Sequence, residues 1–552
     1  MKEKARVGLI IDNKDQSRQL KELIEMSRES DVYEISHLIV QNFPKISPVQ
    51  LFKKNGILKF LSILSFNFIS KIEEFYVKSK SKNKKFATFF KKYNIDEFGL
   101  PIFNVYPKIS QSGFIFKYSN EDLEKIKIEK LDILVRCGSG ILKGEILNVC
   151  KKGIISFHHG DNKVNRGSPP GFWEVLERHK STGFIIQILT EELDGGEILF
   201  KGNIATSNLY TLNKIKLYRK SNIFMHKTLE RLFKEPIKKR FYEKHPYSHL
   251  LYKLPSLTNQ FKYLFITGLY LIKKLKRKFF GKYSWGVAYQ FVDDWKNVTL
   301  WKSKIIKNPP NRFLADPFII TNENKHFCFL ENYSYKSKKG AISVYEIEPS
   351  GEKSLGIALE ENFHLSYPFL LKEKGILYMC PETSMAKDIR IYKCLDFPLN
   401  WKLEKVLMTN VDAADTSIFK YESKWWMMTN IDSSCIGDHD SELHIFSSDE
   451  LLSNSWTPHD LNPVIFDSER ARNGGLIIHN NEFYRVFQKQ GFDLYGEAFG
   501  VARITSLNQE KYEEEIKFEI TPNFIKNSIG AHTLNFENGL LATDFFTYGK
   551  VK

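Results

Sequence analysis

The sequence predicts an α/β domain followed by an all-β domain. Its 552 residues are too many for a single hydrophobic core, because domains usually contain about 100 to 200 residues. The first half alternates short apolar runs with helical patterns, and the second half consists of short aromatic and β-branched runs separated by turn residues. We expect a first domain at residues 1–245, a basic amphipathic linker at 246–285 and a second domain at 286–552.

The first domain opens with a βαβ pattern. The apolar run "KARVGLIID" predicts a strand, "DQSRQLKELIEMSRES" has the spacing of a helix, and "YEISHLIV" predicts a second strand. Further predicted elements are strands at 131–136, 153–158 and 182–189 and a helix at 209–235. This alternation is typical of a Rossmann-like open sheet, in which ligands bind beyond the carboxyl ends of the strands.

The second domain contains a weak internal repeat. Each copy reads as a strand, a polar turn and an aromatic-rich strand, and the copies recur roughly every 45 to 60 residues. The five copies are "FLADPFIITNENKHFCFLEN", "HLSYPFLLKEKGILYMCPET", "DAADTSIFKYESKWWMMTN", "ARNGGLIIHNNEFYRVFQKQ" and "IGAHTLNFENGLLATDFF". Repeats of this length predict a five-bladed β-propeller.

The segment "ISFHHGDNKVNRGSPPGFW", residues 155–173, gathers polar side chains where the predicted strand 153–158 ends. They include His158, His159, Asp161, Asn162 and Arg166. A packed core does not need them, since buried polar groups cost free energy unless they are paired. They either meet a ligand or, for Asp161 and Asn162, build the turn through local backbone hydrogen bonds.

The six cysteines are scattered, without a C-x-x-C pair or partner histidines at metal-ligand spacing, so no metal site is predicted. Scattered thiols of this kind suit a reducing cytoplasm. The apolar run near the start, "VGLII", is shorter than a signal-peptide core, and the run at 263–272 is shorter than a membrane-spanning helix. We therefore expect a cytoplasmic protein without a transmembrane segment.

The net charge of +16 is concentrated in one part of the chain. Residues 211–282 contain nineteen Lys or Arg and three Asp or Glu, an excess equal to the whole net charge. Within them, 261–283 mixes aromatic residues with lysines and arginines, a composition that binds anionic membrane surfaces and would hold the protein at the inner face of a membrane. The alternative is a linker helix whose lysines are simply solvated. Nucleic acid is not expected as a partner, because no base-reading fold accompanies the charge.

Residues 131–204 resemble the folate-dependent formyltransferases, the family that includes methionyl-tRNA formyltransferase, glycinamide ribonucleotide formyltransferase and the sugar N-formyltransferases. The resemblance is carried by "LDILVRCGSGIL", which looks like the family's folate-side strand and loop, by "ISFHHGDNKVNRGSPP", which looks like its Asn-x-His motif, and by "TGFIIQILTEELDGGEIL", which is close to its Leu-Asp-x-Gly signature. The resemblance implies formyl transfer from 10-formyltetrahydrofolate to an amine.

The same resemblance assigns residues to roles. The family's catalytic histidine corresponds to His158 and its aspartate to Asp194, while its asparagine corresponds to Ser156, a departure that concerns the oxyanion donor. The folate loop corresponds to Cys137, Gly138, Ser139, Gly140, Ile141 and Leu142. His159, Asp161, Asn162 and Arg166 have no catalytic counterpart in the family, so they are candidates for binding substrate hydroxyls or a phosphate.

The second domain resembles two kinds of protein. "ADPF" and "FLEN" look like the first blade of five-bladed propeller glycosidases, and "HLSYPFLL", "PET" and "ADTSIF" resemble the N-terminal region of plant glucosaminyl inositol-phosphoryl-ceramide transferases. The second repeat offers Ser366 and Tyr367 where such glycosidases carry an aspartate, which argues against hydrolysis. A glycan or phosphosugar site is expected at Asp316, Glu331, His364, Glu382 and Asp415.

Three functions follow from these resemblances. In the first, the chain transfers a formyl group from 10-formyltetrahydrofolate to a nucleotide-linked or lipid-linked amino sugar in surface-polysaccharide synthesis. In the second, the propeller processes or transfers glycans and the first domain is degenerate, because Ser156 replaces the asparagine. In the third, both domains form a glycan-binding scaffold at a membrane.

Overall fold

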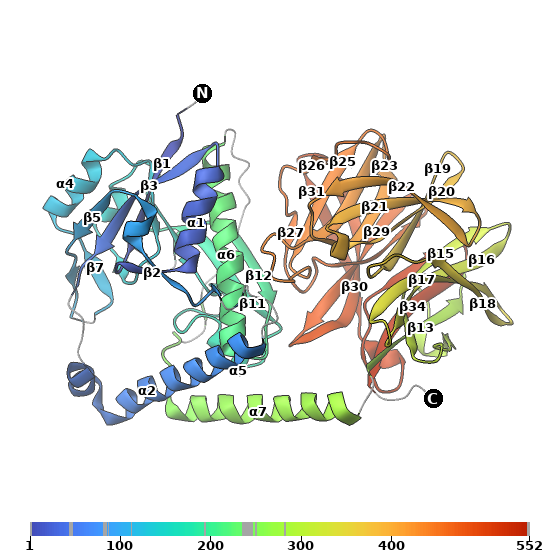
Figure 1. Cartoon of the computed structure of the whole chain (residues 1–552), viewed down its shortest axis with the longest axis horizontal. Helices are drawn as coiled ribbons and strands as arrows, with labels where there is room; N and C mark the ends of the chain where they lie inside the picture. Colours follow the sequence, from blue (N-terminus) through green and yellow to red (C-terminus); the bar gives the residue numbers. More distant parts are fainter. Residues whose placement is uncertain are drawn as a thin grey trace. The chain divides into compact units, whose positions relative to one another are not determined.

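The chain forms two compact units, Met1–Gly268 and Leu269–Lys552 (Figure 1). The computed structural model describes residues 3–43, 48–80, 86, 88–111, 113–192, 195–234, 247–248, 251–280 and 283–548. The boundary between the units falls within helix α7 (Leu257–Phe280), inside the predicted linker. The predicted domain limits at 245 and 286 stay predictions.

A seven-stranded sheet forms the centre of the first unit, in the order β12-β11-β10-β8-β1-β3-β5. Its strands are β1 (Ala5–Ile11), β3 (Tyr33–Gln41), β5 (Ile102–Val105), β8 (Ile133–Arg136), β10 (Ile154–His158), β11 (Ser181–Ile188) and β12 (Glu197–Ala205). The first five are parallel to one another, β11 runs antiparallel to β10, and β12 runs antiparallel to β11. The predicted α/β domain is therefore confirmed.

Helices and short strands complete the first unit (Figure 1). The helices are α1 (Arg18–Glu29), α2 (Pro48–Lys80), α4 (Asn120–Ile128), α5 (Phe172–Leu176), α6 (Tyr210–Phe233) and α7. The short strands are β2 (Asp15–Ser17) with β4 (Lys92–Asn94), and β6 (Lys108–Ile109) with β7 (Ile115–Lys117) and β9 (Ile141–Leu142). The sequence did not predict α2, whose helical backbone is interrupted at Gly56 with φ at 72°.

The order of the parallel strands creates a topological switch point. From β1 the chain continues outward to β3 and β5, and it then returns to β8 and β10 on the other side of β1. The loops after β1 and β8 therefore diverge, and ligands of open α/β sheets bind where such loops separate. Asp12 follows β1, Cys137 follows β8, and His158 ends β10, the next strand along.

The second unit is all-β and contains five antiparallel sheets. The first four follow the chain order: β15 (Arg312–Asn322) to β18 (Gly351–Leu359), β19 (Ser366–Glu373) to β22 (Asn400–Thr409), β23 (Ala413–Tyr421) to β27 (Ile465–Phe466), and β28 (Asn473–His479) to β31 (Tyr512–Ile520). The inner and outer strands of these sheets are β16 (Lys325–Ser334), β17 (Lys339–Glu348), β20 (Ile376–Glu382), β21 (Asp388–Asp396), β24 (Lys424–Ile431), β25 (Glu442–Ser448), β26 (Thr457–Pro458), β29 (Glu482–Gly491) and β30 (Leu494–Leu507).

The fifth sheet joins the two ends of the unit. Strands β13 (Tyr283–Phe291) and β14 (Lys304–Ile306) pair with β32 (Ser528–Gly530), β33 (Leu534–Glu537) and β34 (Leu540–Tyr548). The strands β15, β19, β23 and β28 contact one another in that order, β28 contacts β33, and β33 and β34 contact β15. The predicted all-β domain is confirmed, and the closed five-bladed propeller stays a prediction.

Candidate functional site

His158 is presented by the last position of β10. That strand lies between β8 and β11, with His158 opposite Ile185, and its side chain is half-buried. Its Nε2 lies 3.4 Å from the backbone oxygen of Asn165, in the loop that follows. A Cβ at Gly160 would come within 2.7 Å of that oxygen, so a glycine there lets the loop fold back over the imidazole.

The hydroxyl of Ser156 accepts a hydrogen bond from an arginine. Ser156 points to the same side of β10 as His158, since alternate residues of a strand share a face. It is opposite Arg136 on β8, and Nη1 of Arg136 donates a hydrogen bond of 2.9 Å to its Oγ. On the other side, Gln187 of β11 is opposite Ser156, is 3% exposed, and has an Oε1 without a hydrogen-bond partner among the described residues. The position that holds the family's asparagine is thus lined by a guanidinium and a carboxamide.

The predicted folate loop, residues 137–142, lies at the switch point. The backbone N–H of Ser139 donates to both carboxylate oxygens of Asp12 (2.9 and 2.8 Å), and its carbonyl accepts from Gln41 (3.2 Å). A Cβ at Gly138 would lie 2.5 Å from the Asp12 carboxylate, and one at Gly140 would lie 2.6 Å from the Phe116 ring. Both glycines are therefore required by close packing, and burial raises the pKa of the Cys137 thiol to about 12.

His159 lies in an aromatic stack. Its ring is nearly parallel to that of Tyr218, with centroids 4.0 Å apart, and it also stacks on Phe157 at 5.4 Å. Nε2 is within 3.0 Å of the hydroxyl of Ser221. Burial, together with the neighbouring His158, lowers the pKa of His159 to about 3, so the ring is neutral. These contacts are those of a packing residue, and its predicted role in substrate binding stays a prediction.

The remaining polar residues of the loop bind mainly to the protein itself. The carboxylate of Asp161 pairs with Lys201 (2.7 Å) and accepts from the N–H of Lys163 (2.9 Å). Nε of Arg166 donates to the backbone oxygen of Asn162 (3.1 Å), and its guanidinium lies 4.5 Å from the centroid of the Tyr247 ring. These contacts agree with the turn-building alternative, and substrate binding by these residues is untested.

Two acids bear on the proposed chemistry of His158, one predicted from the sequence and one missed by it. Asp194 lies outside the described residues, so its pairing with His158 stays a prediction. Glu174 of α5 was not singled out from the sequence, because a lone glutamate in a short helix carries no signal. It is 2% exposed, its Oε1 accepts from Nδ2 of Asn165 (2.9 Å), and its Oε2 has no hydrogen-bond partner among the described residues. Burial raises the pKa of Glu174 to about 7.

We expect Glu174→Gln to stabilise the protein at alkaline pH. The pKa of Glu174 is near 4.5 in the unfolded chain and about 7 in the folded protein. Between these pH values the carboxyl ionises more readily in the unfolded chain, so the folded state loses stability as the pH rises. The neutral amide removes this cost, which is on the order of 3 kcal/mol. Chemical unfolding at pH 4.5 and pH 8 measures it. An equal effect of the substitution at both pH values would contradict the assignment.

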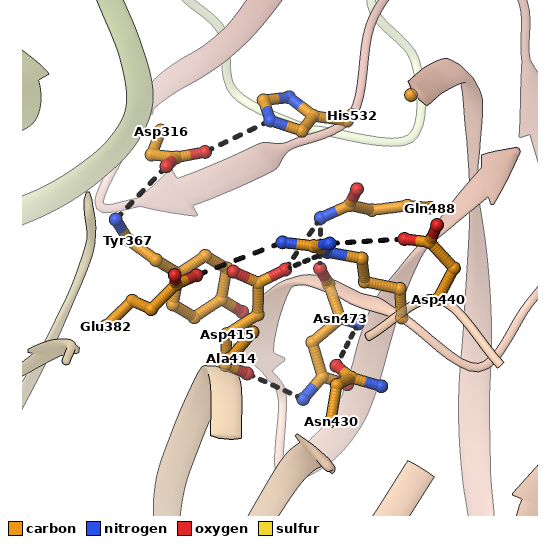
Figure 2. Close-up of polar contacts among 12 residues, drawn as sticks. Asp316, Tyr367, Glu382, Ala414, Asp415, Asn430, Asp440, Asn473, Gln488 and His532 are labelled. Atoms are coloured by element: carbon orange, nitrogen blue, oxygen red, sulfur yellow. Dashed lines mark hydrogen bonds and ion pairs between the residues drawn. The ribbon is translucent and has the colours of Figure 1, made fainter. Parts of the chain in front are cut away.

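In the second unit, three of the repeats place a β-bulge at the same point of their first strand. The register shifts between Ala315 and Phe318, between Ser366 and Phe369, and between Ala414 and Ser417. The bulged residues Asp316, Tyr367 and Asp415 have φ values of 50°, 46° and 49°. Bulges re-aim side chains, and Figure 2 shows these residues gathered in one cluster.

Asp316 is held by backbone donors and a histidine. Its Oδ2 accepts from the N–H of Tyr367 (3.1 Å), and its Oδ1 lies 3.4 Å from Nε2 of His532 (Figure 2). Nδ1 of His532 lies 2.5 Å from Oδ2 of Asp544, whose other oxygen accepts from the N–H groups of His532 and Thr533. Tyr367 occupies the place where glycosidases carry an acid, and its hydroxyl is 3.0 Å from that of Ser417.

Arg472 binds three carboxylates at once. Its Nε donates to Asp415 (2.6 Å), its Nη1 donates to Asp440 (3.1 Å), and its Nη2 lies 3.8 Å from Glu382. Gln488 also donates to Asp415 (3.0 Å). Because a fully buried carboxylate is costly unless it is paired, Arg472 is the group that makes this concentration of acids possible.

The buried acids remain partly protonated near neutral pH. Burial raises the pKa of Asp316 to about 7, against the opposing effect of His532. Burial likewise raises the pKa of Asp415 to about 6, against that of Arg472. Glu331 has a pKa well above its usual range because of burial and the charge of Asp316. Such carboxyls can donate as well as accept hydrogen bonds, as sugar hydroxyls require.

The structure brings the predicted propeller residues together. Asp316, Glu331, Glu382 and Asp415 interact electrostatically, and Nε2 of His364 lies 3.6 Å from Glu331. Residues missed by the sequence reasoning are His532, Asp544, Asp440 and Arg472. His532 carried a usable signal, because it holds the same place in "IGAHT" as Asp316 in "LADPF" and Asp415 in "AADTS". Arg472 carried the same signal, because it follows Ala471 in "ARNGG", whereas Asp440 precedes strand β25 in a loop that the repeat does not cover.

One trio among the described residues has the geometry of a metal site. Ligand atoms of Asp316, His532 and Asp544 all lie within 4.8 Å of one another. Two of these residues already share a hydrogen-bonded pair, and Asp544 accepts three backbone N–H bonds. The trio is therefore held together by the protein's own donors, and the predicted absence of a metal is untested.

Comparisons with known proteins found two kinds of relative. Residues 297–535 match the family model of "Glucosamine inositolphosphorylceramide transferase 1, N-terminal". The protein of that name from Arabidopsis thaliana is 34% identical over 218 residues, 38% of this chain and 28% of that protein. Methionyl-tRNA formyltransferase from Bacillus subtilis is 26% identical over 241 residues, 43% of this chain and 71% of that protein. The chain thus spans little more than a quarter of its plant relative.

Solved structures give two further likenesses. Phosphoribosylglycinamide formyltransferase from Bacillus halodurans has a TM-score of 0.29 and 13% identity, covering 42% of this chain and 96% of its own. The catalytic domain of a Coprinopsis cinerea GH62 α-L-arabinofuranosidase has a TM-score of 0.34 and 10% identity, covering 48% of this chain and 98% of its own. Scores of this size do not establish a common fold. By sequence, the chain is homologous both to methionyl-tRNA formyltransferases and to the N-terminal region of plant glucosamine inositolphosphorylceramide transferases.

Proposed function

We propose that the first unit transfers a formyl group from 10-formyltetrahydrofolate to the amine of a nucleotide-linked or lipid-linked amino sugar. The observation that carries the proposal is the position of His158, which ends β10 beside the switch point and shares a strand face with Ser156 and its partner Arg136. The homology to methionyl-tRNA formyltransferases supports the reaction. The sugar acceptor is supported by the homology of the second unit to proteins named for a glucosamine transfer.

The residues of the switch point fit a folate. Ile141 is a partly exposed apolar side chain, and Gln187 offers a buried acceptor without a partner among the described residues. Leu142 and the two glycines of the loop pack against the protein itself. When bound, the folate supplies an activated formyl group open to attack by an amine. Residues 137–142 would hold its ring system, as the resemblance implies.

His158 and Asp194 have separate roles: one stabilises the developing negative charge and the other accepts a proton. As the amine attacks, negative charge develops on the formyl oxygen, and a donor placed at that oxygen lowers the barrier by about 3 to 4 kcal/mol. His158 is that donor. Asp194 orients the imidazole and, through water, accepts the proton that the amine loses, a general-base contribution of about 10² to 10⁴ in rate. It can return this proton to the folate nitrogen as the bond between that nitrogen and the formyl carbon breaks and tetrahydrofolate leaves.

Arg136 replaces the donor that the family draws from its asparagine. A serine hydroxyl is shorter than a carboxamide, and the guanidinium of Arg136 fills the place by donating to Ser156. A charged guanidinium is also a stronger donor to a developing oxyanion than a neutral amide. Ser156 then serves to position Arg136 rather than to contact the formyl group.

We expect Ser156→Ala to lower kcat about tenfold and to leave KM nearly unchanged. The substitution removes one neutral acceptor for Arg136, and the net value of such a hydrogen bond is about 1 kcal/mol. Steady-state kinetics measure the change. A loss above a thousandfold would mean that the hydroxyl itself acts on the substrate.

The experiment that tests the proposal is mass spectrometry of amino sugars linked to UDP or dTDP, incubated with full-length protein and 10-formyltetrahydrofolate. The expected product has gained one formyl group on its amine. Methionyl-tRNA is the control acceptor, because the homologous enzymes are named for it. If methionyl-tRNA is formylated and no amino sugar is, the proposed amino-sugar acceptor is wrong but formyl transfer itself is supported.

We further propose that the five sheets of the second unit close into a five-bladed propeller that binds a glycan at its centre. Contacts from β15 through β19, β23 and β28 to β33 and back to β15 support the closure. The buried acids around Asp316 and Asp415 support a polar ligand. Should the first unit prove degenerate, this unit would be the functional part. Calorimetry of the full chain with a folate analogue separates the two cases, because only a competent first unit binds it.

A further inference from the structure

Helix α2 is apolar on two opposite faces. One face is buried against the first unit and includes Phe66, Ile69 and Val77. The other face is exposed, and its side chains recur every three or four residues: Ile57, Leu61, Leu64, Phe68, Ile72 and Phe75. Phe75 is 76% exposed and Phe68 is 64% exposed. A helix packs on its own protein through one apolar face. The second apolar face of α2 is therefore expected to contact another molecule.

Helix α7 begins beside α2 and repeats this arrangement (Figure 1). The side-chain amide of Gln260 donates to the backbone oxygen and to the hydroxyl of Ser62 (2.8 and 2.9 Å), and the hydroxyl of Tyr263 donates to Glu73. The face of α7 away from these contacts is exposed, and in the first unit it carries Phe261, Leu264 and Phe265. The exposed apolar side chains of α2 together with these three are here called the α2–α7 surface.

The charges that the two helices themselves carry are mostly positive. Residues 257–280 contain no Asp or Glu, and the two acids of α2 are Glu73, which is buried, and Glu74, which pairs with Lys78. Lys59 and Lys71 are exposed on α2, and Lys262 is exposed on α7, where it pairs with Glu177 (3.1 Å). An apolar stripe flanked by lysines is complementary to a lipid layer that carries anionic headgroups.

We propose that the α2–α7 surface lies on an anionic membrane, with its apolar side chains among the lipid chains and its lysines at the headgroups. No helix in the described part of the chain is long and apolar enough to span a membrane. A second copy of the chain is a poorer occupant, because it would bring lysines against lysines at the same surface. Exposed apolar side chains in this number on neighbouring helices mark an interaction site.

The test uses the full-length protein and sedimentation with vesicles of phosphatidylcholine alone or with phosphatidylserine. Binding is expected only to the anionic vesicles. It should weaken as salt rises from about 0.05 to about 0.5 M, because the Debye length falls from about 14 to about 4 Å. Equal binding to both vesicle types, or binding to neither, would overturn the proposal.

Substitutions assign the binding to the two helices. Phe68→Ser with Phe75→Ser, and separately Phe261→Ser with Phe265→Ser, should each weaken binding at least tenfold, since each pair removes two exposed aromatic side chains. Lys59→Gln with Lys71→Gln should weaken it by a similar factor at low salt. Trp301→Ser is the matched control, because Trp301 is 68% exposed in the second unit and should not change binding.

Formyl transfer to a soluble sugar nucleotide should be the same in all four variants, because none touches the site around His158. This readout also shows that each variant is folded. Light scattering of the wild-type protein in solution provides the remaining check. A dimer that the α2 or α7 variants dissociate would assign the surface to a second copy and refute membrane binding.

Discussion

His158→Ala is expected to abolish formyl transfer while the protein stays folded. The imidazole ends β10, is half-buried and lies 3.4 Å from the backbone oxygen of Asn165, so its removal leaves the strand itself in place. It removes a donor to the developing oxyanion, worth about 10² to 10³ in kcat, and also the partner through which Asp194 is proposed to act. Asp194→Asn should produce a comparable loss.

Single-turnover mass spectrometry with a saturating amino sugar measures this loss, and circular dichroism with thermal unfolding establishes that the variants are folded. His159→Asn is a useful companion variant. His159 stacks between Phe157 and Tyr218, so this change should lower stability more than it lowers kcat. Full activity in His158→Ala would exclude the proposed mechanism. An inactive His159→Asn variant with unchanged stability would assign the catalytic role to His159 instead of His158.

Arg136→Met is expected to lower kcat by about 10² to 10³ with a small change in KM. Methionine keeps the length and apolar stem of the side chain but removes the charged donor that lies 2.9 Å from Ser156. If Arg136 bound the substrate equally well in the ground state and the transition state, its loss would raise KM and leave kcat unchanged. A change in kcat therefore indicates a role in catalysis, and a change in KM indicates a role in substrate binding.

A second substitution makes the role of Arg136 specific. Adding Ser156→Asn to Arg136→Met restores the asparagine of the resembling family, and we expect it to recover at least tenfold of the lost kcat. Ser156→Asn alone should not raise activity, because Arg136 already fills the place. A double variant no better than Arg136→Met would mean that the guanidinium serves structure or substrate binding and not the oxyanion.

Much of the candidate site is readable from local patterns. The strand that delivers His158 was predicted at 153–158 and is Ile154–His158, because an apolar run bounded by a glycine and a polar loop carries its own burial signal. The repeat likewise located Asp316 and Asp415, since each copy bulges at the same point of its first strand. Helix α2 was missed, because apolar residues on both faces remove the one-sided period by which an amphipathic helix is recognised.

The sequence by itself determined the division into an α/β half and an all-β half, the opening βαβ unit, and the strand that ends at His158. These features follow from periodicity and burial within short windows. Only the tertiary structure decided which side chains meet: Arg136 with Ser156 through the register of β8 and β10, and Asp316 with His532, 216 positions later in the chain. The physical reason is that register and long-range packing depend on the summed contacts of whole strands. No local pattern encodes the partner that a polar side chain will find.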